Sequence, residues 1–488
     1  MRWPRPRSCG PPPTWSPPPS RTASHPTRSN VSPDASSRCC APTGHPSPPT
    51  TVSDRESRIS VMRIAVIGSG IAGLTAAWLL DGTHEVTVFE ELAKVGGHAD
   101  TVSCEVDGRR IEIDVGAQHL APDAFPVHTA LRRLLGITDQ HTVPVPLTTT
   151  ITTTSADPLL VTPHAPLEAA GDRHAVTGEA WQVLGGFVEH AMSFEDGGDW
   201  NVTLAELTER AGVPQPWAEG LIHPWLASFV GCDTRTAARM SARAAISWVT
   251  RTPPAAPDQA PVFHNLTGGV GGLAEALAAR LAKPVRTATP VRHMDVAADG
   301  GTVTVIDDTG RRQEFDRAVL AVPAPTAAAL LARTRGYERH RAELRSFDYV
   351  PTSVAVHRDP IYMPRDRLHW STNTTFIHDG WAETSTWYGP INGTDVFKSW
   401  TTHRQKPRHL IAERSFEHLS VTPEAVRSRG RLRAVQRNDP GPVLLAGSYL
   451  QDIDSQESAT RSGYAAATAL GVTGEEVSIL GTAHPQPR

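Results

Sequence analysis

A strand–turn–helix pattern near residue 70 constrains this chain more than any other feature. The apolar run Ile64–Ile67 leads into Gly68, Gly70 and Gly73, and the residues after Gly73 follow a helical period. Glycines at this spacing between a strand and a helix are typical of a turn that binds a dinucleotide. Gly68 permits the tight turn, Gly70 lets the backbone approach a pyrophosphate, and Gly73 lets the helix pack closely on the strand.

The start of the helix and the end of the next strand extend this pattern. The helix N-terminus, at Ile71 and Ala72, offers free N–H groups and a positive dipole end to phosphates. A glycine pattern alone also fits a Gly-rich turn without a ligand. Here Glu90 ends the next strand, where an acid accepts hydrogen bonds from the adenosine ribose hydroxyls. An acid at this position favours FAD or NAD over NADP.

The following motifs distinguish FAD from NAD. Gly96 and Gly97 stand in KVGGHADT, and Gly116 stands in IDVGAQHL. Together with the turn at Gly68, these segments resemble the flavin-containing amine oxidase superfamily, which also holds the carotenoid-type desaturases. The family usually has an arginine at the FAD phosphates where this chain has His98. A bacterial branch of predicted NAD/FAD-binding proteins, which this chain resembles, also reads GGH at this position. Imidazole is only partly charged at neutral pH, so this phosphate contact is weaker than an arginine contact.

Two segments in the middle of the chain extend the resemblance. Residues Asn265–Leu281 resemble the family's glycine turn and the helix after it. Val291 matches the strand valine whose backbone holds the adenine in the family. Gly268–Gly272 could instead form a second phosphate loop, but no clean apolar strand leads into it, so we favour a structural turn.

The segment Leu444–Leu470 resembles the family's closing motif, which consists of a buried strand, a glycine, a polar loop and a helix. The resemblance implies that Gly447 and Ser448 approach the ribityl chain and the phosphates. It also implies that Ser458 and Ala459 offer backbone N–H groups to the flavin pyrimidine ring. A helix N-terminus at that place would stabilise the negative charge of a reduced flavin.

The order of strands and helices from Met62 predicts an α/β fold. We expect an FAD-binding Rossmann-like domain of the type seen in this family and a discontinuous α+β substrate domain. The FAD-binding domain is assigned to residues 62–150, 260–345 and 438–475, the substrate domain to 151–259 and 346–437, and a flexible C-terminus to 476–488. Residues from about 165 to 250 are predicted to be mostly helical. Glu314–Val322 is predicted as one strand, and Leu368–Trp400 as antiparallel sheet. Val443–Leu445 is predicted as a last short buried strand, followed by a helix. Asp454 and Glu457 have the spacing of an N-cap and the third residue of that helix, Gly463 allows close packing, and Gly471 is its expected C-cap.

Residues 1–61 differ in composition from the rest of the chain. They are rich in Pro, Ser, Thr and Arg and show no hydrophobic period, so they cannot bury enough apolar surface to fold. We interpret them as a disordered tail or as residues that precede the true start of translation at Met62. A Pro-rich docking segment is the alternative.

Composition excludes several classes of protein. The net charge of −4 gives no attraction to nucleic acid, and no apolar run is long enough to span a membrane. The chain has five cysteines, at Cys9, Cys39, Cys40, Cys104 and Cys232. They show neither zinc-ligand spacing nor a disulfide framework, and no metal cluster stands out in the sequence. We therefore expect reduced cysteines and a cytoplasmic protein.

The substrate side is less defined by sequence. Aromatic residues that could line an apolar pocket, or equally form ordinary core, are Trp370, Trp381, Trp387, Tyr388, Trp400 and Tyr449. Candidate acid–base groups are His119, His357 and His369. Many amine oxidases keep a lysine near flavin N5, and by that resemblance Lys398 is the candidate here.

Three functions are compatible with these motifs. The leading hypothesis is an FAD-dependent oxidoreductase that removes a hydride from a small, partly apolar substrate, because only one convincing dinucleotide motif is present. The second is a flavin-dependent isomerase, which would not accumulate reduced flavin when its substrate is added without oxygen. The third is a binding protein of the same fold that does no redox chemistry. The motifs identify no catalytic residue, substrate, electron acceptor or oligomeric state.

Overall fold

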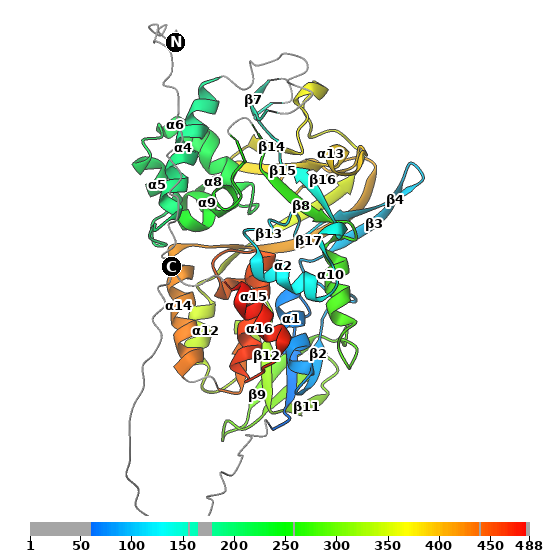
Figure 1. The fold of residues 1–488 in the computed structure, drawn as a ribbon. Helices are drawn as coiled ribbons and strands as arrows, with labels where there is room; N and C mark the ends of the chain where they lie inside the picture. The colour runs from blue at the N-terminus through cyan, green and yellow to red at the C-terminus, as the bar shows by residue number, and fades with distance from the viewer. Residues whose placement is uncertain (1–59, 155–156, 164–177, 257–258, 439–440, 485–488) are drawn as a thin grey trace, which may run out of the picture. The chain divides into compact units, whose positions relative to one another are not determined.

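The computed structural model describes residues 60–154, 157–163, 178–256, 259–438 and 441–484 (Figure 1). The expected N-terminal tail therefore lies outside the described residues, apart from Ser60 and Val61. Cys104 and Cys232 are free cysteines, and the other three cysteines are also outside this part.

A four-stranded parallel sheet lies at the centre of one half of the molecule. Its order is β18-β12-β1-β2, from Val443–Leu445, Arg317–Leu320, Arg63–Ile67 and Glu85–Phe89. The residues Ile64–Ile67 of β1 are no more than 5% exposed, as expected for a parallel strand covered on both faces. Strands from both ends of the described chain therefore belong to one sheet, with β12 between β1 and β18.

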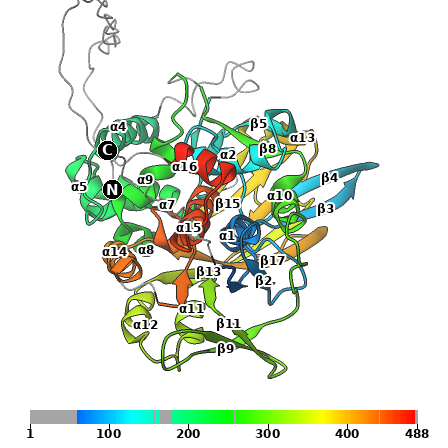
Figure 2. The same cartoon turned by 60° about the horizontal axis from the view of Figure 1, so that its bottom comes forward.

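Helices α1 (Ile71–Asp81) and α15 (Gln456–Ala469) pack against each other beside this sheet (Figures 1 and 2). A Cβ at Gly463 would lie 2.3 Å from the carbonyl oxygen of Ala72, so only glycine allows this approach. Gly471 follows α15 with a φ of +84°, which is the left-handed residue expected after a helix end.

The predicted single strand Glu314–Val322 is wrong. The chain forms β11 (Arg312–Phe315), which joins β10 (Val303–Asp307) and β9 (Val291–Val296) in an antiparallel sheet, and then β12 in the parallel sheet. Asp316 separates β11 from β12, because its N–H donates to Arg63 O and its carboxylate accepts from Arg63 N–H. A contact with the first strand therefore turns the chain between the two sheets.

A seven-stranded sheet occupies the other half, in the order β17-β13-β16-β15-β14-β6-β7. In that order its strands are Leu410–Ser420, Asp348–His357, Phe397–Trp400, Trp381–Trp387, Asn373–His378, Thr149–Thr152 and Pro158–Val161. The antiparallel sheet predicted over Leu368–Trp400 is confirmed in β14, β15 and β16.

A group of short helices covers the β6–β7 end of this sheet (Figure 1). Its members are α4 (Glu179–Glu195), α5 (Leu204–Arg210), α6 (Gln215–Trp217), the π-helical turn η3 (Ala218–Ile222), α7 (His223–Ala227), α8 (Thr234–Arg239) and α9 (Ala242–Thr250). The helical stretch predicted for residues 165–250 is thus confirmed from residue 179 onward, and residues 164–177 lie outside the described part.

The remaining elements lie around the two main sheets. They are β3 (Thr101–Val106), β4 (Arg109–Asp114), α2 (Pro126–Leu134), η1 (Asp139–His141), β5 (Thr142–Pro146), β8 (Val262–Leu266), α10 (Gly269–Ala278), α11 (Ala324–Leu330), α12 (Glu338–Leu344), η4 (Arg367–His369), α13 (Gly389–Asn392), α14 (Pro423–Asn438) and η5 (Ser448–Leu450). The β3–β4 hairpin projects from the body in both ribbon views (Figures 1 and 2).

The expectation of a flexible C-terminus at 476–488 is wrong for its described part. Residues Glu475–Ala483 form helix α16, which packs against α2 and α15. Leu480 is fully buried in this contact. Val477 and Ala483 pack against the same core, so apolar contacts hold the segment in place.

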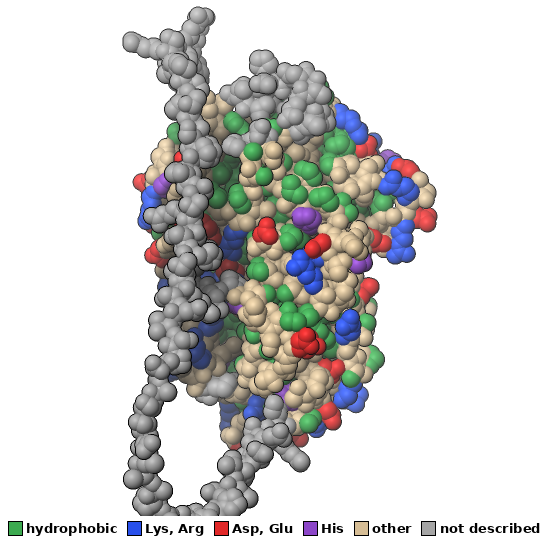
Figure 3. Space-filling view, viewed as in Figure 1, with side chains coloured by type: hydrophobic (Ala, Val, Ile, Leu, Met, Phe, Trp, Pro, Cys, Tyr) green, Lys and Arg blue, Asp and Glu red, His purple; other side chains and the backbone are tan. Residues whose placement is uncertain are grey.

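Charged side chains of both signs are interspersed over the face in Figure 3. This mixture agrees with the absence of a strong net charge. Among the described residues, no helix combines the length and the apolar composition needed to cross a membrane.

Candidate cofactor and substrate cavity

One cavity of about 1520 Å³ extends along the junction of the parallel sheet and the seven-stranded sheet. Thirteen of the fifteen residues predicted to contact the cofactor line it: Gly68, Gly70, Ile71, Ala72, Glu90, Gly96, Gly97, His98, Gly116, Val291, Gly447, Ser448 and Ala459. The two that do not are Gly73 and Ser458. Segments that are nearly 400 residues apart in the sequence thus converge on one continuous space.

The glycine turn has the geometry that its sequence predicts. Gly68 has a φ of +98°, and a Cβ there would lie 2.4 Å from Ala321 O. A Cβ at Gly73 would lie 2.0 Å from Gly68 O, so Gly73 serves helix packing and does not need to reach the cavity. Gly70 is the N-cap of α1 and provides no side-chain cap, so the first N–H groups of the helix are left to face the cavity.

Glu90 lies in the cavity wall directly after β2 and is 7% exposed. Its Oε2 accepts hydrogen bonds from the N–H (2.9 Å) and Oγ (2.7 Å) of Ser69, and its Oε1 accepts from Leu92 N–H at 2.9 Å. The carboxylate therefore fixes the glycine turn. It also retains acceptor capacity toward the cavity, since two carboxylate oxygens offer about four lone-pair sites.

The Gly96–His98 segment packs beside the same turn. Gly96 N–H donates to Ser69 O at 2.9 Å, and a Cβ at Gly116 would lie 2.2 Å from His98 O. The His98 ring lies 5.2 Å from the His418 ring, centroid to centroid. With Asp454 these histidines form the one group of potential metal ligands among the described residues, whose ligand atoms lie within 4.8 Å of one another.

The turn at Gly268–Gly272, for which a second phosphate loop was the disfavoured alternative, does not line the cavity. Gly269 has a φ of +69°, and the N–H groups of Val270 and Gly271 donate to Asp114 Oδ1 and Thr101 Oγ1, both at 2.9 Å. The turn therefore binds the β3–β4 hairpin, which favours the structural interpretation. The sequence showed no clean apolar strand before this turn, but strand β8 does lead into the turn.

The predicted cap of α15 needs correction. Ser455, not Asp454, is the N-cap, and its Oγ accepts from Ser458 N–H at 3.1 Å. Asp454 instead accepts from Ser448 Oγ at 2.6 Å. Glu457 caps another helix, because its two oxygens accept from Val127 and His128 N–H at 3.3 and 2.8 Å.

The expectation that Ser458 and Ala459 offer free N–H groups is also wrong. Ser458 N–H is donated to Ser455 Oγ, and Ala459 N–H is donated to Ser455 O. Helix geometry leaves the N–H groups of Gln456 and Glu457 as the first-turn donors. Of these two residues, Gln456 lines the cavity.

Lys398 lies in the cavity wall and is 5% exposed. Its Nζ donates to Gly116 O and to Gln118 Oε1, both at 3.1 Å. Burial lowers the pKa of Lys398 to about 8, with partial opposition from the charge of Asp114. The lysine that the resemblance singled out therefore holds a labile proton beside the cavity.

His119 is the one sequence-predicted acid–base candidate that lines the cavity; His357 and His369 do not. Its backbone has a φ of +61°, and its Nδ1 lies 2.8 Å from Asn265 Oδ1. Burial lowers the pKa of His119 to about 4, so the ring is neutral at physiological pH.

Only Trp400 and Tyr449 of the predicted pocket aromatics line the cavity. Trp370 and Trp387 form an edge-to-face pair, Trp381 stacks on His403, and Tyr388 is buried in the core. The cavity instead uses Trp181, Trp225 and Trp248 of the helical group. The sequence predicts that these tryptophans lie in helices, but tertiary packing determines which of them point into the cavity.

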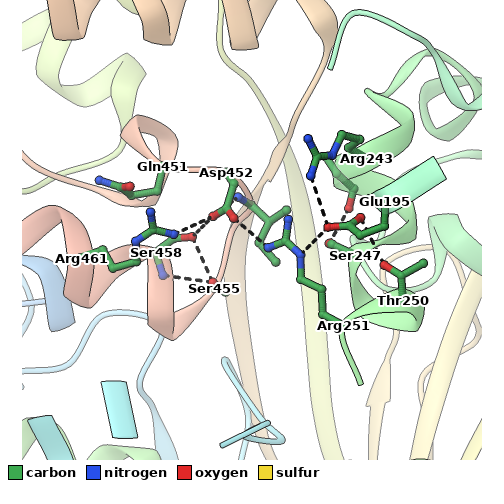
Figure 4. A network of polar contacts seen from close by, with 12 residues as sticks. Glu195, Arg243, Ser247, Thr250, Arg251, Gln451, Asp452, Ser455, Ser458 and Arg461 are labelled. Atoms are coloured by element: carbon green, nitrogen blue, oxygen red, sulfur yellow. Dashed lines mark hydrogen bonds and ion pairs between the residues drawn. The ribbon is translucent and has the colours of Figure 1, made fainter. Parts of the chain in front are cut away.

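A polar bridge behind the cavity wall joins the helical group to the segment before α15 (Figure 4). Arg251 donates to Asp452 Oδ2 at 2.7 Å and to Glu195 Oε1 at 3.0 Å. Burial raises the pKa of Asp452, but the charges of Arg251 and Arg461 outweigh this effect and lower it. Residues on both sides of the bridge, such as Thr252 and Asp454, line the cavity.

A parallel sheet whose first strand enters a glycine turn, with a lined cavity above it, defines an α/β protein of the dinucleotide-binding type. Solved structures share this fold over most of the chain, as the sequence predicted. Residues 71–360 match the flavin containing amine oxidoreductase family, and this match covers more than half of the 488 residues. The chain belongs to this family.

Among the structures of similar fold are three enzymes. Cyclohexylamine oxidase from Brevibacterium oxydans IH-35A has a TM-score of 0.61 at 15% identity, over 84% of this chain and 99% of that one. A CLA-producing fatty acid isomerase from P. acnes has a TM-score of 0.60 at 14% identity, over 82% and 97%. Putrescine oxidase bound to putrescine has a TM-score of 0.58 at 15% identity, over 84% and 98%.

Curated proteins match only short stretches. Uncharacterized protein MJ1488 of Methanocaldococcus jannaschii is 39% identical over 61 residues, which are 12% of this chain and 14% of that protein. The L-amino-acid oxidase of Pseudechis australis is 47% identical over 47 residues, 9% of each. The matched stretches therefore cover only a small part of either relative.

Proposed function

We propose that this protein is an FAD-dependent oxidoreductase that removes a hydride from a small, largely apolar organic molecule. The observation that carries the proposal is the single cavity lined by both the Gly68–Ala72 turn and the Gly447–Ala459 segment. Its length suits an elongated dinucleotide with a substrate at one end. Family membership supports a flavin as that dinucleotide.

The residues present fit FAD. The uncapped N-terminus of α1 would bind the diphosphate through backbone N–H groups and the helix dipole. Glu90, buried in the wall, would accept hydrogen bonds from the ribose hydroxyls, and Val291 begins the strand beside it. The first turn of α15, at Gln456 and Glu457, would face the pyrimidine end of the flavin.

When bound, FAD would take up the hydride and later pass the electrons to oxygen or another acceptor. The chain's own residues have the remaining tasks. Lys398 would hold a proton at Nζ near the reacting carbon, with Gly116 O and Gln118 fixing its position. Trp225, Trp248 and Trp400 would exclude water and orient the substrate C–H bond.

Gly70 provides a sharp test. Its φ is −67°, and the nearest atom to an added Cβ is Gly96 O at 3.9 Å, so Gly70→Ala leaves the fold intact. The added methyl group would nevertheless stand where the diphosphate must approach. We expect purified wild-type protein to show the flavin absorption bands, and Gly70→Ala to lose bound flavin.

Gly82→Ala, at the other end of α1, is the matched control. A Cβ there meets no atom within 4 Å and φ is −69°, so this variant should retain flavin like the wild type. A wild-type preparation that stays colourless after FAD addition would refute the proposed function. Equal flavin content in Gly70→Ala and Gly82→Ala would refute the assigned diphosphate position.

A further inference from the structure

A row of polar side chains crosses the cavity face of the seven-stranded sheet. The strand register places Lys398 of β16 opposite Thr386 of β15, Thr386 opposite Asn373 of β14, and Asn373 opposite Thr149 of β6. Thr149 N–H then donates to Thr162 Oγ1 at 2.7 Å. All five residues line the cavity. The row therefore leads away from the buried lysine across four neighbouring strands to Thr162, just after β7.

The members of the row hold one another in place. Thr386 Oγ1 donates to Asn373 Oδ1 at 2.8 Å, which leaves the Asn373 amide NH₂ as a donor. In the next row, Thr375 Oγ1 lies 2.9 Å from Thr384 Oγ1. Such neutral hydroxyls and amides can both donate and accept hydrogen bonds, so they match hydroxyl or carbonyl oxygens.

The opposite wall is apolar. It is formed by side chains of the helical group, namely Trp181, Leu184, Val188, Trp225, Phe229 and Trp248. The cavity between them therefore has one hydrogen-bonding side and one apolar side.

Charge is missing from this part of the wall. The cavity-lining residues of β6, β7, β14 and β15 are Thr149, Ile151, Leu160, Thr162, Asn373, Thr375, Thr384 and Thr386, and none is ionisable. The helical wall contributes one carboxylate, Glu189, which is exposed. A buried ammonium group without an anionic partner is costly, and here it would meet the positive charge of Lys398 instead.

We propose that this end of the cavity binds an uncharged molecule with an apolar side and hydroxyl or carbonyl oxygens along the other side, not a cationic amine. The inference rests on the proposed function, because it treats the end of the cavity beyond Lys398 as the substrate site. It departs from the amine substrates named for two of the neighbouring structures.

The test compares 1-decanol with decylamine, which have the same alkyl chain but differ in charge at pH 7. Binding to the full-length protein is measured by tryptophan fluorescence and by titration calorimetry, with and without FAD. The fluorescence reports on this site because four tryptophans line the cavity: Trp181, Trp225, Trp248 and Trp400. We expect decanol to bind at least ~10-fold more tightly, since an unpaired buried ammonium costs more than a neutral hydroxyl.

Two threonine variants locate the effect. Thr386→Val removes a hydroxyl from the row and should weaken decanol binding ~3–10-fold. Thr374→Val is the control, because Thr374 is buried on the neighbouring strand and does not line the cavity. It should leave decanol binding unchanged.

The outcomes separate this inference from the proposed function. Preference for decanol in a protein that binds no flavin would support the substrate class and refute the redox proposal. Flavin binding together with equal or tighter binding of decylamine would overturn the substrate class alone. So would a lack of binding by both probes, or equal effects of the two threonine variants.

Discussion

A single buried amine illustrates how residue chemistry and stability are linked here. Lys398 is nearly inaccessible, and burial lowers its pKa to about 8 from the usual 10.5. Between these two pH values the unfolded chain binds more protons at this site than the folded protein does. The contribution of Lys398 to the free energy of unfolding must therefore rise with pH across this window.

Replacing Lys398 tests this linkage. In Lys398→Met, the contribution of up to ~1.4 kcal/mol per pH unit to the free energy of unfolding should disappear between pH 8 and 10. Urea denaturation at several pH values measures it. Lys283→Met is the control, because Lys283 is exposed and pairs only with Glu85 at 3.4 Å. An unchanged slope in Lys398→Met would show that this lysine is not the titrating group.

His98 is the residue at which this chain departs from the usual family pattern. Arginine there would be permanently charged and able to bind a diphosphate through two parallel N–H groups, whereas the two ring nitrogens of an imidazole diverge and cannot bind it in this way. We expect His98→Arg to tighten FAD binding ~3–10-fold at pH 8, and His98→Ala to weaken it. Flavin fluorescence quenching gives both affinities. Equal affinities in all three proteins would mean that His98 does not face the diphosphate.

At the scale of elements, the sequence predicts what local chemistry determines. The turn at Gly68, strand β18 and the close approach at Gly463 follow from residue type and spacing alone. The cap of α15 does not. Asp454 and Ser455 are both good N-caps, and the choice falls on Ser455 because Asp454 binds Ser448.

Long-range contacts explain the other failures in the same way. Glu457 caps α2, a helix more than 300 residues earlier in the chain, and no local spacing indicates such a partner. The cavity tryptophans Trp181, Trp225 and Trp248 were equally hard to predict, because helical periodicity shows that a face is apolar but not what it packs against. The cofactor end of the cavity was therefore predictable, and the substrate end was not.

The bridge between Arg251 and Asp452 couples two elements across the cavity wall (Figure 4). Its side chains are 23% and 22% exposed, so it should contribute more than a surface pair. In a double-mutant cycle with Arg251→Met and Asp452→Leu, we expect a coupling energy of ~1–3 kcal/mol. The exposed pair Arg312–Asp295, at 61% and 49% exposure, should give ~0–1 kcal/mol. Similar values for the two pairs would show that the bridge does not couple the elements.

For the whole molecule, residues from both ends of the described chain line one cavity, so the proposed cofactor would contact both of them. A dinucleotide that binds the folded state stabilises it by mass action, and it should reduce local opening wherever it makes contact. We therefore expect FAD to slow amide hydrogen exchange in two separate regions, Ile67–Leu74 and Gly447–Ala459. Mass-spectrometric exchange of the apo and FAD-loaded protein measures this directly.

Helix α5 (Leu204–Arg210) serves as the internal reference for that experiment, because none of its residues lines the cavity. Its exchange should change much less than that of the two ligand-contacting regions. Gly70→Ala should abolish protection in both regions together, although Gly447–Ala459 is distant from the substitution in sequence. Protection confined to one region would mean that the two segments do not share a ligand, and the arrangement of the whole site would have to be revised.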